Sequence, residues 1–385
     1  MSDVAGVVGH LFRREAGKMV ATLVRVLGVR RVDLAEDAVQ EALCSALATW
    51  KFGRLPENPA AWLFQAARRR AIDLLRRERT FARVARELEA SGASEDDQLR
   101  LMIACCAPGI PEEAQVAVIL KFLCGFGVPE IAAAFLCTEA AVEKRISRAK
   151  GVLKRSGRLP EAGLRLDAVR QALYLLFSEG YHGSHPENAV REELCAEAVR
   201  LGALLPEGPE TAALLALFCF HAARLATRID REGCLIALEA QDRSRWNRAL
   251  IAQGFSFMER ARGEAITPYH LEAGIAALHC SAPSFERTDW AAILKLYDLL
   301  YRLRPTPIVA LNRAIVVGRR EGPARGLEAL DRIRAPRGYP FYPAARGEFL
   351  RQAGREAEAR EEYRRALGLA RNEAERRFLR GRARP

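Results

Sequence analysis

The sequence has few aromatic residues and no long apolar run. Phe, Trp and Tyr make up 7% of its 385 residues, whereas Ala, Leu and Arg are frequent. Gly and Pro stand mostly between stretches with helical periodicity, so we expect an all-α protein, long enough for two or more packed domains. No apolar run is long enough to cross a membrane and no signal-peptide pattern is present, so we expect a cytoplasmic protein without a membrane partner.

The nine cysteines lack the spacing of a metal site or of a disulfide framework. Cys105 and Cys106 are adjacent and no C-x-x-C pair occurs, which is typical of buried free thiols in a reducing cytoplasm. Phosphate-binding loops, zinc-protease motifs and nucleophile elbows are also missing. The sequence therefore predicts neither an enzyme nor a cofactor.

Two polar segments of the C-terminal half favour a structural interpretation. His182 and His185 lie in EGYHGSHPEN, where a turn-like setting is more typical of structural hydrogen bonds than of metal ligands. DRSRW, from Asp242 to Trp246, is expected to tie helices together. Because no convincing carboxylate pair stands nearby, we expect no metal site; the acidic residues considered are Asp230, Glu232 and Glu239.

Acidic residues are outnumbered by basic ones, 48 to 60, which gives a formal net charge of +12. Half of this excess lies in residues 1–160. A moderately basic chain favours polyanion partners such as nucleic acid, although an Arg-rich proteome produces the same balance.

An amphipathic helix is predicted in DLAEDAVQEALCSALATW, from Asp33 to Trp50. Apolar side chains recur at helical spacing and form one stripe: Ala35, Val39, Ala42, Ala46 and Trp50. The other side of this helix carries polar residues and is expected to be exposed: Glu36, Asp37, Gln40 and Glu41.

A Gly- and Pro-containing loop, KFGRLPEN, precedes a second helix. Asn58 and Pro59 fit the N-cap and first turn of a helix that runs to about Arg79. Its apolar face holds Leu63, Phe64, Ala67, Ala71, Leu74 and Leu75, and its other face holds Trp62, Gln65, Arg69, Arg70, Asp73 and Arg76. A Trp beside arginines suits the stacking of an unpaired base. Packing of Trp62 under a neighbouring helix fits the same pattern, so both interpretations stay open.

The segment FGVPEIAAAFLCTEAAVEKRISRAKGVLKR, residues 126–155, predicts two helices joined by a short turn. Thr138 fits the N-cap of the second helix. One side of that helix gathers Val142, Ile146, Ala149 and Leu153, and the opposite side gathers Lys144, Ser147, Arg148, Lys154 and Arg155. This arrangement is typical of a helix-turn-helix whose second helix enters the major groove. A solvated amphipathic helix in a bundle would show it as well.

The C-terminal portion contains a weak repeat of about 33 residues. Small residues stand where two helices would cross, as in tetratricopeptide repeats: Ala314, Val317, Gly326, Leu330 and Ile333 match Gly347, Leu350, Ala359, Tyr363 and Ala366. A half-unit from Trp290 to Pro305 precedes them. We expect a short helical array that offers a concave surface to a protein or peptide.

Together, DLAEDAVQEA, NPAAWLFQAARRRAIDLLRRE and PEIAAAFLCTEAAVEKRISRAK resemble a bacterial extracytoplasmic-function RNA polymerase sigma factor. The later segments LYLLFSEGYHGSHPENAVREELCAEAVRLGALL and QDRSRWNRALI resemble the subgroup with a long C-terminal, tetratricopeptide-like extension. The resemblance implies sigma region 2 in residues 10–79, a linker in 80–97, sigma region 4 in 98–156, a helical extension domain in 164–285 and helical repeats in 286–385.

Partners and site residues follow from the resemblance. It implies binding of the polymerase clamp helices, in the largest subunit of core RNA polymerase, by Asp37, Gln40 and Glu41. It implies that the loop from residue 51 to 58 captures a flipped base of the promoter −10 element. The residues that it implies for binding this element, called the −10 set below, are Lys51, Arg54, Asn58, Trp62, Arg69 and Arg70. The residues that it implies for reading the −35 element, called the −35 set below, are Glu143, Lys144, Arg145, Ser147 and Arg148.

Glu143 departs from the family pattern, in which a basic residue is common. Either this helix prefers a different base or Glu143 pairs with a neighbouring cation. A regulatory protein is the partner expected at the repeats, where the extension would regulate the sigma domains by contact. Two alternatives are a DNA-binding regulator that does not recruit polymerase, and a scaffold whose basic faces are only solvated. The sequence does not set the oligomeric state.

Overall fold

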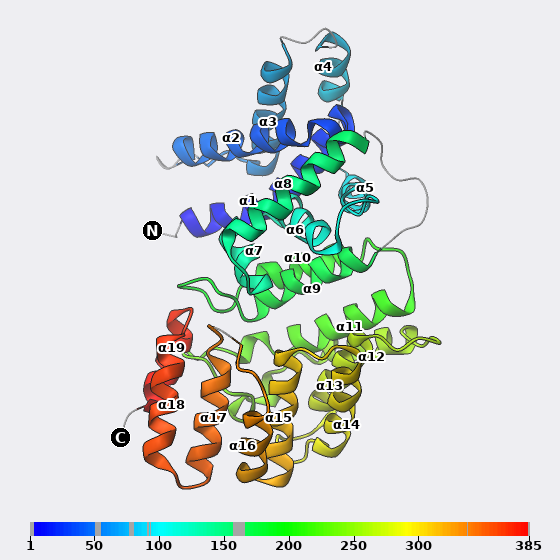
Figure 1. Cartoon of the computed structure of the whole chain (residues 1–385). Helices are drawn as coiled ribbons and strands as arrows, with labels where there is room; N and C mark the ends of the chain where they lie inside the picture. Colours follow the sequence, from blue (N-terminus) through cyan, green and yellow to red (C-terminus); the bar gives the residue numbers. More distant parts are fainter. Residues whose placement is uncertain are drawn as a thin grey trace. The chain divides into compact units, whose positions relative to one another are not determined.

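The computed structural model describes residues 4–50, 55–76, 81–90, 92, 94–156, 166–336 and 338–383. All regular elements in this part of the chain are helices, apart from one isolated β-bridge between Ile229 and Leu235. The expected all-α fold is therefore confirmed. The chain divides into two compact units, Met1–Leu176 and Phe177–Pro385 (Figure 1).

Unit 1 opens with the helices of the expected N-terminal domain. They are α1 (Val4–Leu27), the short 3-10 helix η1 (Val29–Arg31), α2 (Val32–Trp50) and α3 (Pro59–Leu75). Helices α1, α2 and α3 contact one another around buried apolar side chains such as Leu23, Val39 and Leu63. The backbone N–H of Ala61 donates to Asn58 Oδ1 at 3.0 Å, so the predicted N-cap is confirmed. The end of the predicted helix, residues 77–79, lies outside the described residues.

Residues 80–97, expected to link two domains, contain a packed helix. Helix α4 (Phe81–Ala90) contacts α1 and α3, and it buries Val84, Ala85 and Leu88. Its strongly one-sided apolar pattern explains this packing. Helix α5 (Glu95–Cys105) begins before the end of the same segment.

The remainder of unit 1 is built around a buried central helix. This helix, α6 (Glu112–Phe122), contacts α5, α7 (Val128–Phe135) and α8 (Glu139–Ser156). From Ala114 to Leu120 every residue of α6 is buried, as expected for a helix surrounded by others. The domain boundary expected at residues 156–163 falls outside the described residues apart from its first residue.

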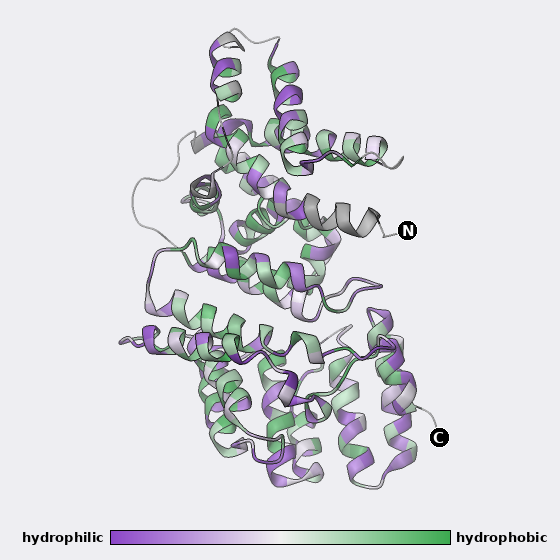
Figure 2. Cartoon of the chain, turned by 180° about the vertical axis from the view of Figure 1, so that it is seen from behind, coloured by the Kyte–Doolittle hydropathy of each residue, from purple (hydrophilic) through white to green (hydrophobic). Residues whose placement is uncertain are grey.

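Unit 2 continues from α9 (Asp167–Tyr181), the helix that spans the division between the units. Its other helices are α10 (Glu192–Gly202), α11 (Pro209–Ala222), α12 (Arg248–Arg260), α13 (Pro268–Ser281), α14 (Trp290–Leu303), α15 (Pro307–Glu321), α16 (Pro323–Asp331), α17 (Phe341–Gln352), α18 (Glu356–Gly368) and α19 (Glu373–Ala383). Short 3-10 helices η2 (Leu225–Thr227), η3 (Leu238–Ala240) and η4 (Arg243–Arg245) lie between α11 and α12. Polar and apolar residues alternate along most helices (Figure 2), as amphipathic packing requires.

The repeat expected at the C-terminal end is seen as two successive helix pairs, α15 with α16 and α17 with α18 (Figure 1). Small residues stand at the crossings, where a methyl group on Gly318 or Gly326 would overlap the ring of Phe349. In the next pair, Gly347, which matches Ala314 of the first, faces Tyr363 and Ala359. The sequence period thus reflects a repeated close approach of helices.

Candidate nucleic-acid and polymerase interfaces

The polar side of α2 is exposed only in part. Asp37, Gln40 and Glu41 are exposed, as the helical pattern predicts. The prediction that Glu36 shares this exposure is wrong, because Glu36 is 9% exposed. Two cations cover it: Lys150 Nζ lies 2.6 Å from Glu36 Oε2, and Lys121 Nζ lies 3.4 Å from Glu36 Oε1.

The −10 set is only partly brought together. Lys51 and Arg54 lie outside the described residues. The side-chain oxygen of Asn58 is engaged in capping α3. Trp62 is half-buried, and its ring meets that of buried Trp50 edge to face, with centroids 5.4 Å apart. Trp62 therefore packs against α2 on one side and stays partly exposed, and its role in base stacking stays a prediction.

The two arginines of the −10 set differ in their surroundings. Arg70 donates from Nη2 to Glu41 Oε1 at 2.8 Å, so it connects α3 to the polar side of α2. Arg69 is exposed on α3. In the free protein Arg69 is therefore the more accessible cation for a DNA strand.

Helices α7 and α8 form the expected helix-turn-helix. Leu136 begins the turn with a left-handed backbone (φ 51°), a conformation uncommon for a residue with a side chain. Thr138 Oγ1 accepts from the N–H of Ala141 at 3.3 Å, so the predicted N-cap of α8 is confirmed. The predicted inner face of α8 is buried against the rest of unit 1; it comprises Val142, Ile146, Ala149 and Leu153.

The −35 set divides into exposed and engaged side chains. Four of its members are exposed on α8: Glu143, Lys144, Ser147 and Arg148. Arg145 forms an ion pair with Glu113 of α6 and lies over the ring of Phe135, 5.2 Å from its centroid. Of the two alternatives for Glu143, pairing with a cation is not observed within the described part of the chain.

The far end of α8 contacts the start of α2, which the sequence did not predict. Lys150 Nζ lies 3.1 Å from Asp33 Oδ1, and Lys154 also pairs with Asp33. Burial acts to lower the pKa of Lys150, but its hydrogen bonds and charge interactions with Glu36 and Asp33 outweigh burial and raise it. Burial acts to raise the pKa of Asp33, and Lys154 and Lys150 outweigh it and lower this pKa.

In unit 2, the histidines of EGYHGSHPEN make structural hydrogen bonds, as expected. His182 Nε2 lies 2.9 Å from Glu375 Oε1 on α19, and Asn372 donates to the carbonyl of Gly183 at 3.0 Å. His185 Nδ1 accepts from two backbone N–H groups of its own turn. This segment therefore fastens the last helix to the start of unit 2.

A group of arginines, of which Arg224 is buried, lies beside this segment. Arg224 donates to Tyr181 Oη at 2.7 Å, and Arg228 lies over the Tyr181 ring, 3.8 Å from its centroid. Burial acts to raise the pKa of Tyr181, but the two guanidinium groups outweigh burial, so this pKa is lowered. From DRSRW, Arg243 donates to the carbonyls of His279 and Ala282, so this motif ties helices together as predicted.

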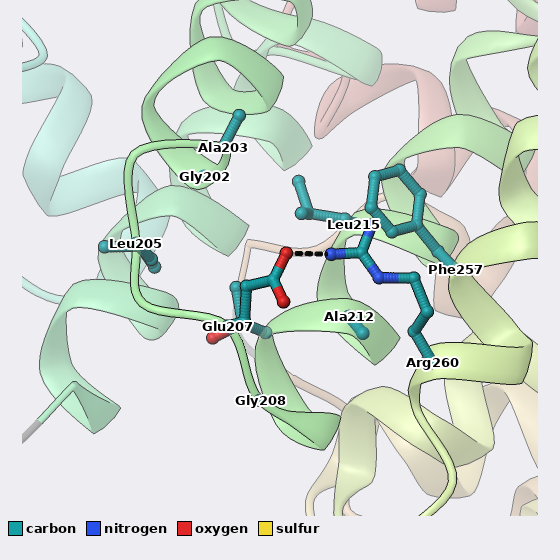
Figure 3. Close-up of a pocket in the computed structure, with 10 residues that line it drawn as sticks. Gly202, Ala203, Leu205, Glu207, Gly208, Ala212, Leu215, Phe257 and Arg260 are labelled. Carbon is teal, nitrogen blue, oxygen red and sulfur yellow. Dashed lines mark hydrogen bonds and ion pairs between the residues drawn. The ribbon is translucent and has the colours of Figure 1, made fainter.

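Two cavities in the described part of unit 2 are lined in part by aromatic side chains. One, of about 500 Å³, lies between the α10–α11 connection and the end of α12 (Figure 3). Apolar side chains such as Leu215 and Phe257 line it, and Arg260 bonds to Glu207 across it at 2.5 Å. The other, of about 180 Å³, is lined by residues that include Trp290, Tyr297 and Arg319.

Comparisons with known proteins match this arrangement part by part. Sigma-70 region 2 matches residues 11–81, Sigma-70, region 4 matches residues 100–153, and a Family of unknown function (DUF6596) matches residues 165–262. An uncharacterized protein of Rhizobium meliloti (strain 1021) is 39% identical over 378 residues, which cover 91% of this chain and 89% of that protein. No solved structure matches the chain.

A chain that joins sigma regions 2 and 4, with a helix-turn-helix in the second, is a sigma factor. The chain belongs to the extracytoplasmic-function sigma factors, in the subgroup that carries a C-terminal extension. Sigma factors are non-enzymatic regulators that bind core RNA polymerase and promoter DNA and direct promoter-specific transcription. No helix in the described residues is both long and apolar enough to cross a membrane.

Sequence reasoning missed the contact of Asp33 and Glu36 with Lys121, Lys150 and Lys154. The spacing of Asp33 and Glu36, and of Lys150 and Lys154, places each pair on one face of its helix. That spacing was a usable signal for two charged faces. It could not show that the faces meet, because they are separated by more than 100 residues of sequence.

Proposed function

We propose that α8 reads the −35 element while α2 and α3 engage polymerase and the −10 element. The observation that carries this proposal is the combination, in one unit, of an exposed polar face on α2 and exposed long donors on α8. Groove recognition needs such donors because phosphates and guanine edges accept hydrogen bonds. A DNA-binding regulator that does not recruit polymerase needs no exposed α2 face of this kind.

Within α8, Lys144, Ser147 and Arg148 are the residues proposed to donate to DNA. Glu143, exposed beside them, would accept from the exocyclic amine of cytosine. Arg145 is proposed to contact DNA only after it leaves Glu113, so its first role is to hold α8 on α6.

For the −10 element, the loop from residue 51 to 58 is proposed to hold the flipped base, with Lys51, Arg54 and Asn58 as its polar members. Flipping a base costs a few kcal/mol, which a fitted pocket and nearby cations must offset. Arg69 would contact the separated strand directly. Trp62 would act from its packed position against Trp50, and Arg70 would act after leaving Glu41.

The direct test is selection of promoter DNA from a random library in complexes with core RNA polymerase. We expect enrichment of two elements with a fixed separation. Arg148→Ala should relax the base preference at one −35 position, and Arg69→Ala should weaken the −10 element instead. Enrichment of a single element, with no requirement for polymerase, would support the regulator alternative and contradict the proposal.

We further propose that unit 2 regulates the sigma regions by binding a protein or peptide on the surface of its repeats. A helical array presents an extended concave surface, and the cavity beside Trp290 and Tyr297 offers an aromatic site on α14. To test this, transcription by the full chain is compared with that of a chain ending at Tyr181, after circular dichroism shows that the shorter chain is folded. Equal activity and promoter choice would contradict regulation by the extension.

A further inference from the structure

Three lysines of sigma region 4 converge on two carboxylates of sigma region 2. Lys121 of α6 and Lys150 and Lys154 of α8 are three of the seven lysines in the sequence. All three pair with Asp33 or Glu36 in the first turns of α2. The Glu36–Lys150 pair is largely covered, with side chains 11% and 22% exposed, whereas the Asp33 and Lys154 side chains are 37% and 47% exposed. Covered pairs resist screening by salt better than exposed pairs do.

Region 2 also contacts region 4, and the chain directly before it, without lysines. Arg25 Nε lies 2.9 Å from Asp97 Oδ1, and Thr22 donates to the other oxygen of the buried Asp97 side chain at 3.2 Å. Helix α1 approaches the chain after α6 so closely that a methyl group on Gly17 would overlap the carbonyl of Leu123. The contact between the regions is therefore fixed by shape as well as by charge.

This packed arrangement conflicts with promoter binding. Elements centred near −35 and −10 are about 25 base pairs apart, or roughly 85 Å at 3.4 Å per base pair. In unit 1, by contrast, Lys150 on the recognition helix contacts Glu36 on α2 at 2.6 Å. Regions 2 and 4 therefore cannot bind the −10 and −35 elements at the same time until this contact opens.

The lysines themselves have the chemistry of a phosphate-binding surface. An ammonium group donates hydrogen bonds to a phosphate oxygen much as it does to a carboxylate oxygen. Lys150 and Lys154 lie on the helix that is proposed to enter the groove, on the flank next to its exposed donors. Asp33 and Glu36 thus supply the anions that a DNA backbone would supply.

We propose that Lys121, Lys150 and Lys154 form a DNA phosphate-binding surface that Asp33 and Glu36 mask in the free protein. Loading onto polymerase and promoter exchanges the two carboxylates for phosphates and separates region 4 from region 2. The DNA part of this inference rests on the proposed function, whereas the masking contact does not.

The masking contact is tested on the free, full-length protein by zero-length carbodiimide coupling and peptide mass spectrometry. We expect amide links from Lys150 or Lys154 to Asp33 or Glu36, together with the Lys18–Glu15 link within α1 as an internal control. Formation of the control link alone would overturn the masking contact. Because neither polymerase nor DNA is present, that failure is distinct from failure of the proposed sigma function.

The phosphate surface is tested by the affinity for a 30-base-pair duplex of random sequence at low salt. Asp33→Asn with Glu36→Gln should raise affinity about 5- to 10-fold, because the change unmasks three cations. The matched control, Asp73→Asn with Glu87→Gln, removes two exposed carboxylates of the N-terminal helices and should have a much smaller effect. An equal gain in both variants would show a general charge effect and overturn the masking proposal.

A second variant should open the contact between α2 and α8 without a change in charge. Gly17→Ala should force α1 away from Leu123, which should reduce the Lys150 and Lys154 links while the Lys18–Glu15 link persists. Adding Lys150→Ala to the Asp33→Asn, Glu36→Gln variant should cancel part of that variant's gain in DNA affinity. Unchanged links in a folded Gly17→Ala protein would contradict the closed contact.

Discussion

At the scale of single residues, neighbouring arginines of α8 have different tasks. Arg148 is exposed, whereas Arg145 is held by Glu113 and the Phe135 ring. Arg148→Ala should weaken −35 binding by about 1–3 kcal/mol if Arg148 contacts a base. Fluorescence anisotropy with selected promoter DNA measures this loss.

Arg145→Ala provides the comparison. It should lower the thermal stability of unit 1, because Glu113 loses its partner and Phe135 loses a covering group. A protein in which Arg148→Ala leaves −35 affinity unchanged would contradict the assignment of this face of α8 to DNA.

Asp37 tests the other interface. Asp37→Ala should impair association with core polymerase and leave binding of duplex DNA by α8 intact, since Asp37 is exposed on α2 and is not among the carboxylates that contact the lysines of α8. Titration of labelled core polymerase measures the association. Asp73→Ala, on α3, serves as a control of equal charge. Normal polymerase affinity in the Asp37 variant would remove the proposed docking face.

At the scale of elements, the repeat depends on glycines that allow helices to approach closely. Gly318→Ala should destabilise the protein by about 1–3 kcal/mol, because the new methyl group overlaps the buried Phe349 ring. Thermal or denaturant unfolding measures the loss. Gly368→Ala is the matched control: nothing lies near its added methyl group, and helix propensity should make it neutral or stabilising by up to about 1 kcal/mol. Equal effects would argue against tight packing at Gly318.

Elements were predicted from sequence where their signals are local. Helical spacing placed the buried face of α8, and capping chemistry placed Asn58 and Thr138 at the starts of α3 and α8. The exposure of Glu36 was predicted wrongly because helical spacing describes one helix and not what covers it. Arg145 was assigned to DNA alone for the same reason: its partner Glu113 belongs to another helix.

At the scale of the whole molecule, acid should weaken unit 2. Burial, reinforced by Arg228, outweighs Glu375 and lowers the pKa of His182 from 6.5 to about 4; burial and the charges of Arg224 and Arg243 lower that of His279 to about 3. The unfolded chain therefore binds more protons than the folded one below pH about 6.5. Stability should be complete above that pH and fall progressively toward pH 4.

Thermal unfolding of the full chain between pH 7.5 and 4.5 measures this loss. The His182→Gln variant should show a shallower fall in Tm over the same range, because one of the two partly buried histidines no longer titrates. A Tm that is constant from pH 6.5 to 4.5 would contradict the neutral state of these two side chains in the folded protein.

The long-range organisation of the molecule was beyond sequence reasoning. Charge balance favoured a polyanion partner, but the convergence of Lys121, Lys150 and Lys154 on Asp33 and Glu36 depends on the packing of helices distant in sequence. The attachment of α19 to His182 is of the same kind. Local periodicity carries no information about such pairings.

The most direct measurement is size exclusion of the purified full chain with core RNA polymerase, repeated with the Asp33→Asn, Glu36→Gln variant. We predict co-elution of the wild-type chain, stronger for the variant, and initiation from selected promoters by both complexes. Failure of both proteins to co-elute, with duplex DNA binding retained, would contradict the sigma role and favour a regulator that does not recruit polymerase.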